Sequence, residues 1–249
     1  MEAVPSCFTF KSPQCSIIFT GPTTYSIGAN PESLKAVDVN GDGKPDIIAS
    51  NYGSNTASVL LNTGNGAFSA QTIYSTGAGP YKLTVADVNG DGKPDIIVAN
   101  SGSNNVGVLL NTGNGAFSAQ TNYSTGSKPG AVVAVDVNGD GKPEIIVANS
   151  GNGAFSAQTI YSTGIAPDGV VAADVNGDGK PDIIVANYLS NNVGVLLNIG
   201  SGTFTAQTTY SAGAGPSCVA VADVNGDNKP DIIVGNYDSN NLGVLLAYC

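Results

Sequence analysis

Short apolar runs alternate with polar clusters along almost the whole chain. In the second repeat unit, described below, the apolar runs occupy residues 82–86, 95–99, 105–110 and 116–123. Each run has the length of a β-strand and is rich in β-branched or aromatic residues. The clusters between the runs, such as Asn-Gly-Asp-Gly and Thr-Gly-Asn-Gly, tolerate the positive φ of tight turns. The pattern therefore predicts four antiparallel strands, which we call A, B, C and D.

This four-strand pattern repeats along the chain. The segment Asp-Val-Asn-Gly-Asp-Gly-Lys-Pro-Asp begins, with small changes, at Asp38, Asp87, Asp136, Asp174 and Asp223, so it recurs every 49 residues except for one step of 38. Such periods are typical of solenoids, propellers and arrays. Antiparallel four-stranded sheets repeated around an axis form a β-propeller, which leaves only short sheet edges. We therefore expect an all-β fold, a five-bladed β-propeller of four-stranded antiparallel blades.

The two ends of the chain predict how the ring closes. A lone D-like strand is expected at residues 17–25, and a C-like strand at residues 242–247 ends the last repeat. The N-terminal strand would supply the D strand that the last blade lacks, an arrangement called Velcro closure. On this interpretation residues 1–15 are an N-terminal extension and residues 16–249 form a single propeller domain of five repeats. The alternative is a fragment of a longer array.

The third repeat is shorter than the others. Its missing piece corresponds to residues 103–113 of the second repeat, which include strand C. We expect a third blade short of one strand, with residues 154–161 pairing against strand B in place of C and residues 162–169 returning across the blade. The uncovered edge would be a candidate site for a dimer. An error in the gene model explains the short repeat equally well.

Charge is concentrated in the repeated segment. The chain has a formal net charge of −10, with nineteen acidic residues, nine Lys and Arg together, and no His. Such a chain repels phosphate backbones, so nucleic-acid binding is not expected. It also lacks an apolar run long enough to cross a bilayer, and its start lacks the features of a signal peptide. The clustering of acidic residues points to a cation as partner.

Oxygen-bearing side chains occupy the first, third, fifth and ninth positions of each segment, and the carbonyl at the seventh is available as well. Hard oxygen ligands at alternate positions fit Ca²⁺, and glycine at position six permits the sharp turn. We expect up to five Ca²⁺ ions, one in each loop between strands A and B. The candidate ligands are Asp38, Asn40, Asp42, Lys44 and Asp46; Asp87, Asn89, Asp91, Lys93 and Asp95; Asp136, Asn138, Asp140, Lys142 and Glu144; Asp174, Asn176, Asp178, Lys180 and Asp182; and Asp223, Asn225, Asp227, Lys229 and Asp231.

Two loops depart from the pattern. Glu144 replaces Asp at the ninth position of the third loop, so its longer side chain must fold back or bind through both oxygens. Asn228 replaces Gly at the sixth position of the fifth loop, where Asn tolerates positive φ. The alternative interpretation of all five segments is a polar hairpin turn that binds no metal.

The loops resemble those of the FG-GAP or VCBS family, whose integrin-like propellers hold Ca²⁺ in hairpin loops of the form Asp-x-Asp/Asn-x-Asp-Gly-x-x-Asp. The resemblance spans residues 16–249. An EF-hand is excluded because no helix pattern flanks the loops and position twelve is an alanine such as Ala49. The family implies an extracellular or cell-surface binding module, and the absence of His argues against acid–base or nucleophilic catalysis. A metal-assisted hydrolase is the remaining enzymatic alternative.

The loops between strands B and C should lie on the rim opposite the calcium loops. Several combine a tyrosine with amide side chains, which suits a protein or glycan ligand. The candidate ligand-binding residues are Tyr52, Asn55, Tyr188, Asn191, Tyr237 and Asn240. Protein adhesion and carbohydrate binding as a lectin both remain open, as does the interpretation that these residues only form turns.

The cysteines offer a seal for the ring. Cys15 and Cys249 both align with the turn between strands C and D, so we expect them to form a disulfide. Other pairings through Cys7, and free thiols in a reducing compartment, are the alternatives, and Cys218 has no obvious mate.

Overall fold

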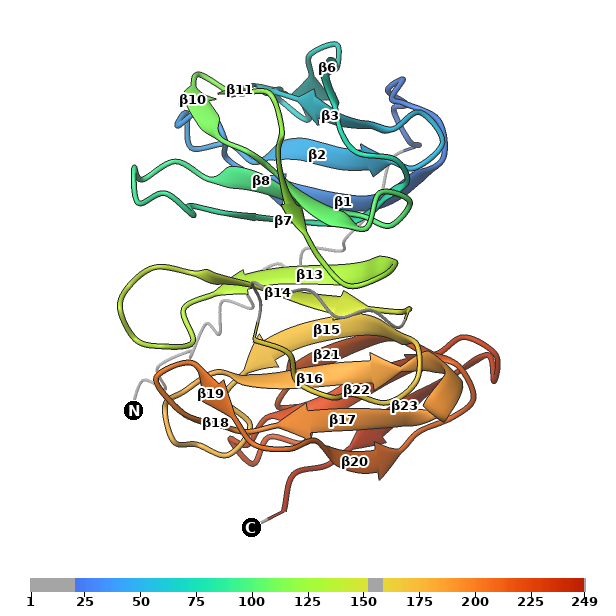
Figure 1. The fold of residues 1–249 in the computed structure, drawn as a ribbon. Coiled ribbons are helices and arrows are strands. Elements are labelled where there is room, and N and C mark those ends of the chain that lie inside the picture. The colour runs from blue at the N-terminus through green and yellow to red at the C-terminus, as the bar shows by residue number, and fades with distance from the viewer. Residues whose placement is uncertain (1–20, 152–158, 249) are drawn as a thin grey trace, which may run out of the picture.

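The structure is a computed structural model that describes residues 21–151 and 159–248. In these residues the chain folds into antiparallel β-sheets arranged one after another along an arc (Figure 1). The first, second, fourth and fifth repeats each form a sheet of three or four strands, which we call blades 1, 2, 4 and 5. The third repeat contributes a two-stranded sheet between blades 2 and 4. The fold is therefore an all-β propeller with four blades of antiparallel strands.

The strands follow the same order in every repeat. Blade 1 consists of β1 (Pro31–Val37), β2 (Asp46–Asn51), β3 (Thr56–Leu60) and β6 (Thr72–Ser75). Blade 2 consists of β7 (Pro80–Ala86), β8 (Asp95–Asn100), β9 (Asn105–Leu109) and β12 (Thr121–Ser124). The third repeat forms β13 (Pro129–Val135) and β14 (Glu144–Asn149). Blade 4 consists of β15 (Pro167–Ala173), β16 (Asp182–Asn187), β17 (Asn192–Leu196) and β20 (Thr208–Ser211), and blade 5 of β21 (Pro216–Ala222), β22 (Asp231–Asn236) and β23 (Asn241–Leu245).

The predicted strands A, B and C are confirmed, but the predicted D strand is not continuous. Its first part pairs instead with the end of strand C in a small separate hairpin. The hairpins are β4 (Asn62–Gly64) with β5 (Ala67–Phe68), β10 (Asn111–Gly113) with β11 (Ala116–Phe117), and β18 (Asn198–Gly200) with β19 (Thr203–Phe204). In blade 2, Ser118 closes this hairpin because its amide donates to the Leu110 carbonyl at 2.8 Å and its hydroxyl accepts from the Leu110 amide at 3.0 Å.

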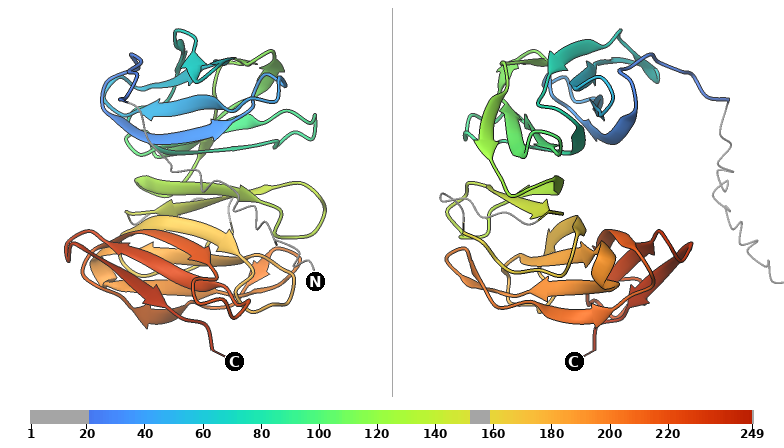
Figure 2. Two further views of the ribbon diagram at one scale, coloured as in Figure 1. Left: turned by 180° about the vertical axis from the view of Figure 1, so that it is seen from behind. Right: turned by 45° about the vertical axis from the view of Figure 1, so that its right-hand side comes forward.

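Neighbouring sheets are held together by branched aliphatic side chains. Ile97, Val106 and Val108 of blade 2 pack with Val132 of β13. The first strands also contact one another in sequence order, β1 with β7, β7 with β13, β13 with β15 and β15 with β21. No comparable contact joins β21 to β1, both of which are fully described. The right-hand view of Figure 2 accordingly shows an arc whose two ends do not meet.

Ring closure by the N-terminal strand is not confirmed. Residues 17–20 lie outside the described residues, and residues 21–25 are described but form no strand. Tyr25 nevertheless packs edge-on against Phe68 with a centroid distance of 5.5 Å, and its hydroxyl accepts the Phe68 amide. Tyr74 and Phe117 make the same contact between blades 1 and 2, also at 5.5 Å. Tyr25 therefore takes the place on blade 1 that Tyr74 of strand β6 takes on blade 2.

The rearranged third blade also stays a prediction. Residues 154–158 of the expected replacement strand lie outside the described residues, and residues 159–161 form no strand. The expected return segment is shorter than predicted, because Pro167 already begins β15.

Among the described residues no helix is long and apolar enough to cross a membrane.

Candidate metal centre

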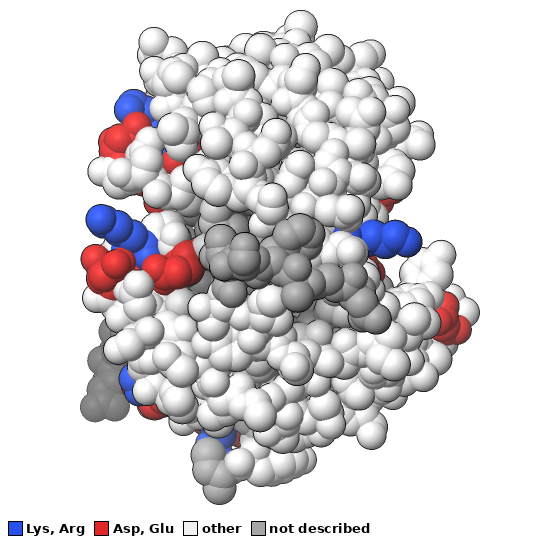
Figure 3. All heavy atoms as spheres, in the orientation of Figure 1, with Lys and Arg blue, Asp and Glu red and all other residues white. Residues whose placement is uncertain are grey.

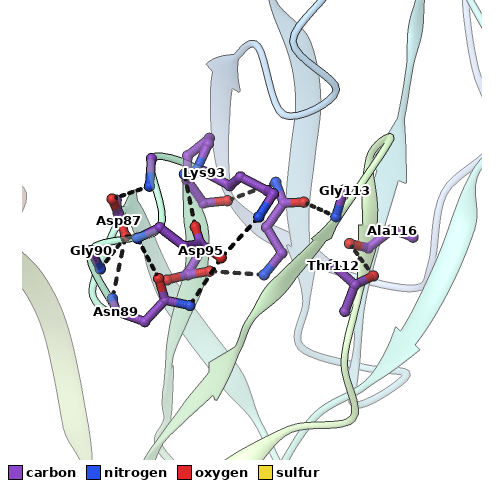
Figure 4. Close-up of polar contacts among 12 residues, drawn as sticks. Asp87, Asn89, Gly90, Lys93, Asp95, Thr112, Gly113 and Ala116 are labelled. Carbon is purple, nitrogen blue, oxygen red and sulfur yellow. Dashed lines mark hydrogen bonds and ion pairs between the residues drawn. The ribbon is translucent and has the colours of Figure 1, made fainter.

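Each loop between strands A and B is organised around its first aspartate. In the second loop, Asp87 Oδ1 accepts the Gly90 amide and Asp87 Oδ2 accepts the Gly92 amide, both at 2.7 Å (Figure 4). Both glycines adopt positive φ, 77° and 79°, as the predicted sharp turn requires. The Gly92 amide, with those of Gly90 and Asp91, holds the pKa of Asp87 below its ordinary value despite some desolvation. This carboxylate is therefore ionised at neutral pH.

The third and fifth positions are held in the same way. Asn89 Oδ1 accepts the Asp91 amide and Asp91 Oδ1 accepts the Lys93 amide, both at 2.9 Å. Each is an Asx-turn, in which a side-chain oxygen accepts the amide two residues on. The Lys93 ammonium lies 3.0 Å from Asp91 Oδ2. The carboxylate at the fifth position is thus already paired with a lysine ammonium group.

The ninth position has a different role. Asp95 is fully buried, its Oδ2 accepts the Val88 amide at 3.0 Å, and its Oδ1 accepts the Asn111 amide at 2.8 Å. The side chain therefore ties the loop to the hairpin that follows strand C. Asp46, Asp182 and Asp231 are fully buried and make the equivalent two bonds. These residues were predicted to bind metal, and that role stays a prediction beside the structural bonds that the carboxylates make.

A buried asparagine extends this network to the preceding blade. Asn111 is 3% exposed, and its Nδ2 donates to the carbonyls of Pro94, at 3.1 Å, and of Val39, at 2.9 Å. Val39 is the second residue of the first loop, so the amide group joins blade 2 to the loop of blade 1. Asn198 repeats the contact by donating to the Val137 carbonyl of the third loop.

The two atypical loops keep the same turn. Glu144 Oε2 accepts the Val137 amide at 3.0 Å, and its Oε1 accepts Asn138 Nδ2 at 2.8 Å. Its longer side chain thus folds back over the loop, which is one of the two arrangements expected for it. In the fifth loop Asn228 adopts φ 61°, and its amide donates to Asp223 Oδ2 at 2.9 Å. Asparagine therefore replaces glycine there without loss of the turn, as predicted.

The donor set of the loops fits Ca²⁺ in its chemistry. Carboxylate, amide and carbonyl oxygens at alternate positions are the ligands that this hard cation prefers, and an oxygen that accepts one backbone amide, such as Asp87 Oδ2 or Asn89 Oδ1, keeps a second lone pair. No group of three acidic side chains converges within the described residues. Acidic and lysine side chains gather at the edge of the molecule that carries the β7–β8 and β13–β14 connections (Figure 3).

The loops between strands B and C lie on the opposite rim, beside the connections that lead into each strand A. The amides of Tyr52, Tyr188 and Tyr237 donate to backbone carbonyls of those connections at 2.8–3.0 Å. Tyr237 is 72% exposed and Tyr52 is 44% exposed. Tyr188 forms part of a short 3-10 helix, η1 (Tyr188–Ser190), and its hydroxyl donates to Asp238 Oδ1 at 2.8 Å, which raises the pKa of the tyrosine.

Two of the three candidate asparagines of this rim accept hydrogen bonds from the next blade. Asn55 and Asn191 adopt positive φ, and their Oδ1 atoms accept the amides of Gly79 and Gly215 in the next blade at 2.8 and 2.9 Å. Asn240 also adopts positive φ but makes no such bond within the described residues. The tyrosines are therefore better placed than the asparagines to meet a ligand.

Sequence reasoning missed part of this rim. Tyr81 stacks edge-on with Tyr52 at 6.5 Å, and Lys82 Nζ lies 4.9 Å from the centre of the Tyr81 ring. Desolvation, followed by the nearby charge of Asp168, raises the pKa of Tyr81. Desolvation also raises the pKa of the half-buried Asp168, and Lys82 opposes that shift. A sequence signal for this surface was available. The residue that follows the proline at the start of strand A differs in every repeat.

The predicted disulfide lies outside the described residues, because both Cys15 and Cys249 do. Cys218 is described and exposed, and its thiol is free.

Comparisons with known proteins agree with this fold. No curated protein matches the chain in sequence at a significant level. The solved structure of the biofilm matrix protein Bap1 of V. cholerae is similar over 88% of this chain and 38% of its own, at 24% identity and a TM-score of 0.55. BBS1N, solved in complex with ARL6DN, is similar over 86% of this chain and 64% of its own, at 15% identity and a TM-score of 0.55. A functionally unknown protein from Desulfotomaculum acetoxidans matches 89% of this chain and 70% of its own, at 11% identity and a TM-score of 0.54.

These likenesses show the fold alone, and this chain spans less than two thirds of Bap1 and of BBS1N. The family is shown by sequence. The model of the FG-GAP-like repeat matches residues 38–98, 87–147, 148–185 and 174–234, which together cover most of the chain. The chain therefore belongs to the FG-GAP-like repeat family.

Proposed function

We propose that this protein is a calcium-stabilised, extracellular binding module that holds a protein partner as part of adhesion. The observation that carries the proposal is the separation of two rims. One rim repeats the same acidic loop, whereas the other presents tyrosines in sequence contexts that differ between blades. A repeated loop suits a structural ion, and a varied aromatic rim suits recognition of a partner.

Calcium is proposed to bind through the loop oxygens at positions one, three, five, seven and nine, the last of which also accepts backbone amides within the protein. The ion would neutralise the loop carboxylates and so stabilise the native state by mass action. The hydrogen bonds of the loop support this, because they hold the side chains of Asp87, Asn89 and Asp91 within one tight turn. No catalytic step is proposed, since the chain has no His and its acidic side chains belong largely to the loops.

The partner is proposed to contact the rim that includes Tyr52, Tyr188 and Tyr237. Large amphipathic rings are the side chains that most often anchor protein interfaces. Bap1, which shares the fold, is a biofilm matrix protein, and that setting supports a role in adhesion and an extracellular location. A carbohydrate ligand is the second candidate, because exposed tyrosines beside the carboxylates of Asp168 and Asp238 also suit stacking on sugar rings.

Closure into a five-bladed ring by the N-terminal strand, with a rearranged third blade and a Cys15–Cys249 disulfide, is one candidate arrangement of the two ends of the chain, and the proposed binding function does not depend on it. What supports closure is the seat of Tyr25 on Phe68. Peptide mapping without reduction would test the disulfide, and recovery of Cys15 and Cys249 unlinked would exclude it.

A binding assay on two kinds of surface tests the proposed function. The protein is applied, in calcium and in EDTA, to immobilised matrix proteins and to a glycan array. We expect calcium-dependent retention on at least one matrix protein and its loss in Tyr237→Ala, with Tyr123→Ala, also an exposed tyrosine but on the outer strand β12, as the control. Retention only on glycans would replace the adhesion proposal with the lectin alternative. Retention that is equal in both variants would exclude the tyrosine rim.

A further inference from the structure

The last blade exposes side chains whose equivalents are buried between blades elsewhere. Leu242 of β23 is 74% exposed, whereas Val106 and Val193 at the same position of β9 and β17 are 2% and 0% exposed. Val244, two residues on, is 50% exposed, whereas Val195 is 6% exposed. We call this surface, with the residues around Leu242 and Val244, the C-terminal end face. It has the composition of an interface without the neighbour that covers it in blades 2 and 4.

The first blade exposes the opposite half of the same contact. Leu34 of β1 is 69% exposed, whereas Leu83 and Val132 at the same position of β7 and β13 are 2% and 5% exposed. Pro31 is exposed too, whereas Pro80 at the start of β7 is buried. We call this surface the N-terminal end face. In the internal contacts these positions receive the apolar side of the preceding blade.

Polar groups on the two end faces are complementary as well. Asn55 and Asn191 each accept the backbone amide that begins the contact with the next blade. Asn240 is the equivalent acceptor on the C-terminal end face, and the amide of Asn30 is the equivalent donor on the N-terminal end face. Neither makes this bond within the described residues, so each end holds half of a hydrogen bond that the internal contacts complete.

The hydrogen bond from the hairpin asparagine to the preceding blade, which we call the asparagine clamp, is also incomplete at the two ends. Asn111 and Asn198 donate to a loop carbonyl of the preceding blade, but within the described part of the chain Asn62 Nδ2 donates to the Pro45 carbonyl of its own blade alone. The carbonyl that would receive it belongs to Val224, which is 49% exposed, whereas Val39 at the same loop position is 3% exposed. Among the residues that the structure describes, the apolar, backbone and side-chain contacts that join internal blades therefore have no partner at either end.

The C-terminal end face also contains a seat for an incoming strand. A shallow groove of about 420 Å³ is lined by Ser217, Gly235, Tyr237 and Leu242 among others. In blade 1 the equivalent of Gly235 is Ser50, whose hydroxyl donates to the Tyr81 carbonyl at the start of β7 at 2.9 Å. The groove thus lies where the start of the next strand A is held in an internal contact.

We propose that the C-terminal end face of one copy of this chain binds the N-terminal end face of a second copy, head to tail. Contact between copies continues the interface between blades and leaves each arc as it is, whereas closure within one chain must bring the two separated ends in Figure 2 together. Such a contact is heterologous, because two different surfaces meet, and it builds rings or open chains of copies. The same apolar surface is buried in the internal contacts, and burying it at the ends as well would remove it from water.

The mass of the protein in solution tests the proposal. Light scattering coupled to gel filtration is run on residues 1–249 at rising concentration. We expect the wild-type mass to reach at least twice that of one chain. Leu34→Glu and Leu242→Glu should each stay monomeric, because each removes one of the two surfaces. Ile199→Glu is the matched control, since Ile199 is 63% exposed but lies on hairpin β18, away from both end faces, and it should associate like the wild type.

A mixture of the two variants distinguishes this geometry from any other dimer. Leu34→Glu keeps its C-terminal end face and Leu242→Glu keeps its N-terminal end face, so an equimolar mixture should form dimers and nothing larger. A wild-type protein that stays monomeric at every concentration would overturn the proposal in favour of closure within one chain. Association that survives both substitutions would overturn it in favour of another surface, such as the edge of the third repeat. The mass of the wild-type protein alone can overturn the proposal, so the test stays valid even if a variant does not fold. Neither overturning result bears on the proposals about calcium binding and the tyrosine rim.

Discussion

At the scale of single residues, the loop carboxylates divide into two kinds. Asp91 at the fifth position is on the surface and meets Lys93, whereas Asp95 at the ninth is fully buried and accepts two backbone amides. The sequence pattern placed both in one ligand set, because spacing shows which residues share a turn but not which way each side chain faces. The burial of Asp95 depends on the hairpin at Asn111, which lies 16 residues later in the chain.

This division predicts different effects for two substitutions. Asp95→Asn places an amide group against buried N–H donors, so in EDTA it should lower the free energy of unfolding by about 2–4 kcal/mol. Asp91→Asn, at an exposed ion pair, should leave unfolding in EDTA unchanged and lose much of the stabilisation by calcium. Urea denaturation of both variants with and without calcium measures this. Equal behaviour of the two variants in EDTA would show that the ninth carboxylate has no structural role.

Removing the charge of Asp168 should raise the stability of the folded protein by an amount that depends on pH. Desolvation raises its pKa in the folded state above the unfolded value near 3.8. The folded state therefore binds the proton more tightly, and this favourable contribution is lost as pH rises through the folded pKa. Asp168→Asn should raise the melting midpoint by roughly 1–3 °C at pH 7, with the difference vanishing below the unfolded pKa. A variant that is less stable than the wild type at pH 7 would show that Asp168 has a stabilising partner.

At the scale of strands and hairpins, most of the regular structure could be predicted from the sequence. Strands A, B and C follow from alternating runs and turn residues, which act locally. The hairpin of β10 and β11 was missed because its boundary is set by Ser118, whose side chain bonds the Leu110 amide across the turn. Such a bond leaves no periodicity in the sequence, so a continuous D strand was the natural but incorrect expectation.

The asparagine clamp predicts a measurable contact between blades. Both asparagines accept the amide two residues on and donate to a proline carbonyl of their own blade, but Asn111 also donates to the Val39 carbonyl of the preceding blade. Asn111→Ala therefore removes one bond more than Asn62→Ala. We expect Asn111→Ala to cost about 1–2 kcal/mol more than Asn62→Ala in urea denaturation, because one further buried acceptor loses its partner. Equal costs would mean that the bond to Val39 contributes nothing to the contact between blades.

At the scale of the whole molecule, the family and the propeller fold could be predicted, but closure could not. The repeat specifies the contact between one blade and the next, through residues such as Leu83 and Val106. The number of blades in a full turn depends on the small angle between neighbouring sheets, which no residue pattern encodes. Leu34 and Leu242 are apolar residues at the same repeat positions as their buried equivalents, so the sequence could not reveal that they are exposed here.

Removal and return of calcium test the central claim most directly. The chain is stripped with EDTA, its thermal midpoint is measured, and the melt is repeated as calcium is added, with bound calcium counted by calorimetry. We expect the midpoint to rise with calcium concentration, because each occupied site contributes about 2.7 kcal/mol at a hundred times its dissociation constant, and each kcal/mol shifts a domain of this size by about 2–4 °C. Magnesium, which is smaller and demands near-octahedral geometry, should act more weakly. A midpoint that is the same in EDTA and in millimolar calcium, with no heat of binding, would contradict the claim that these loops hold calcium.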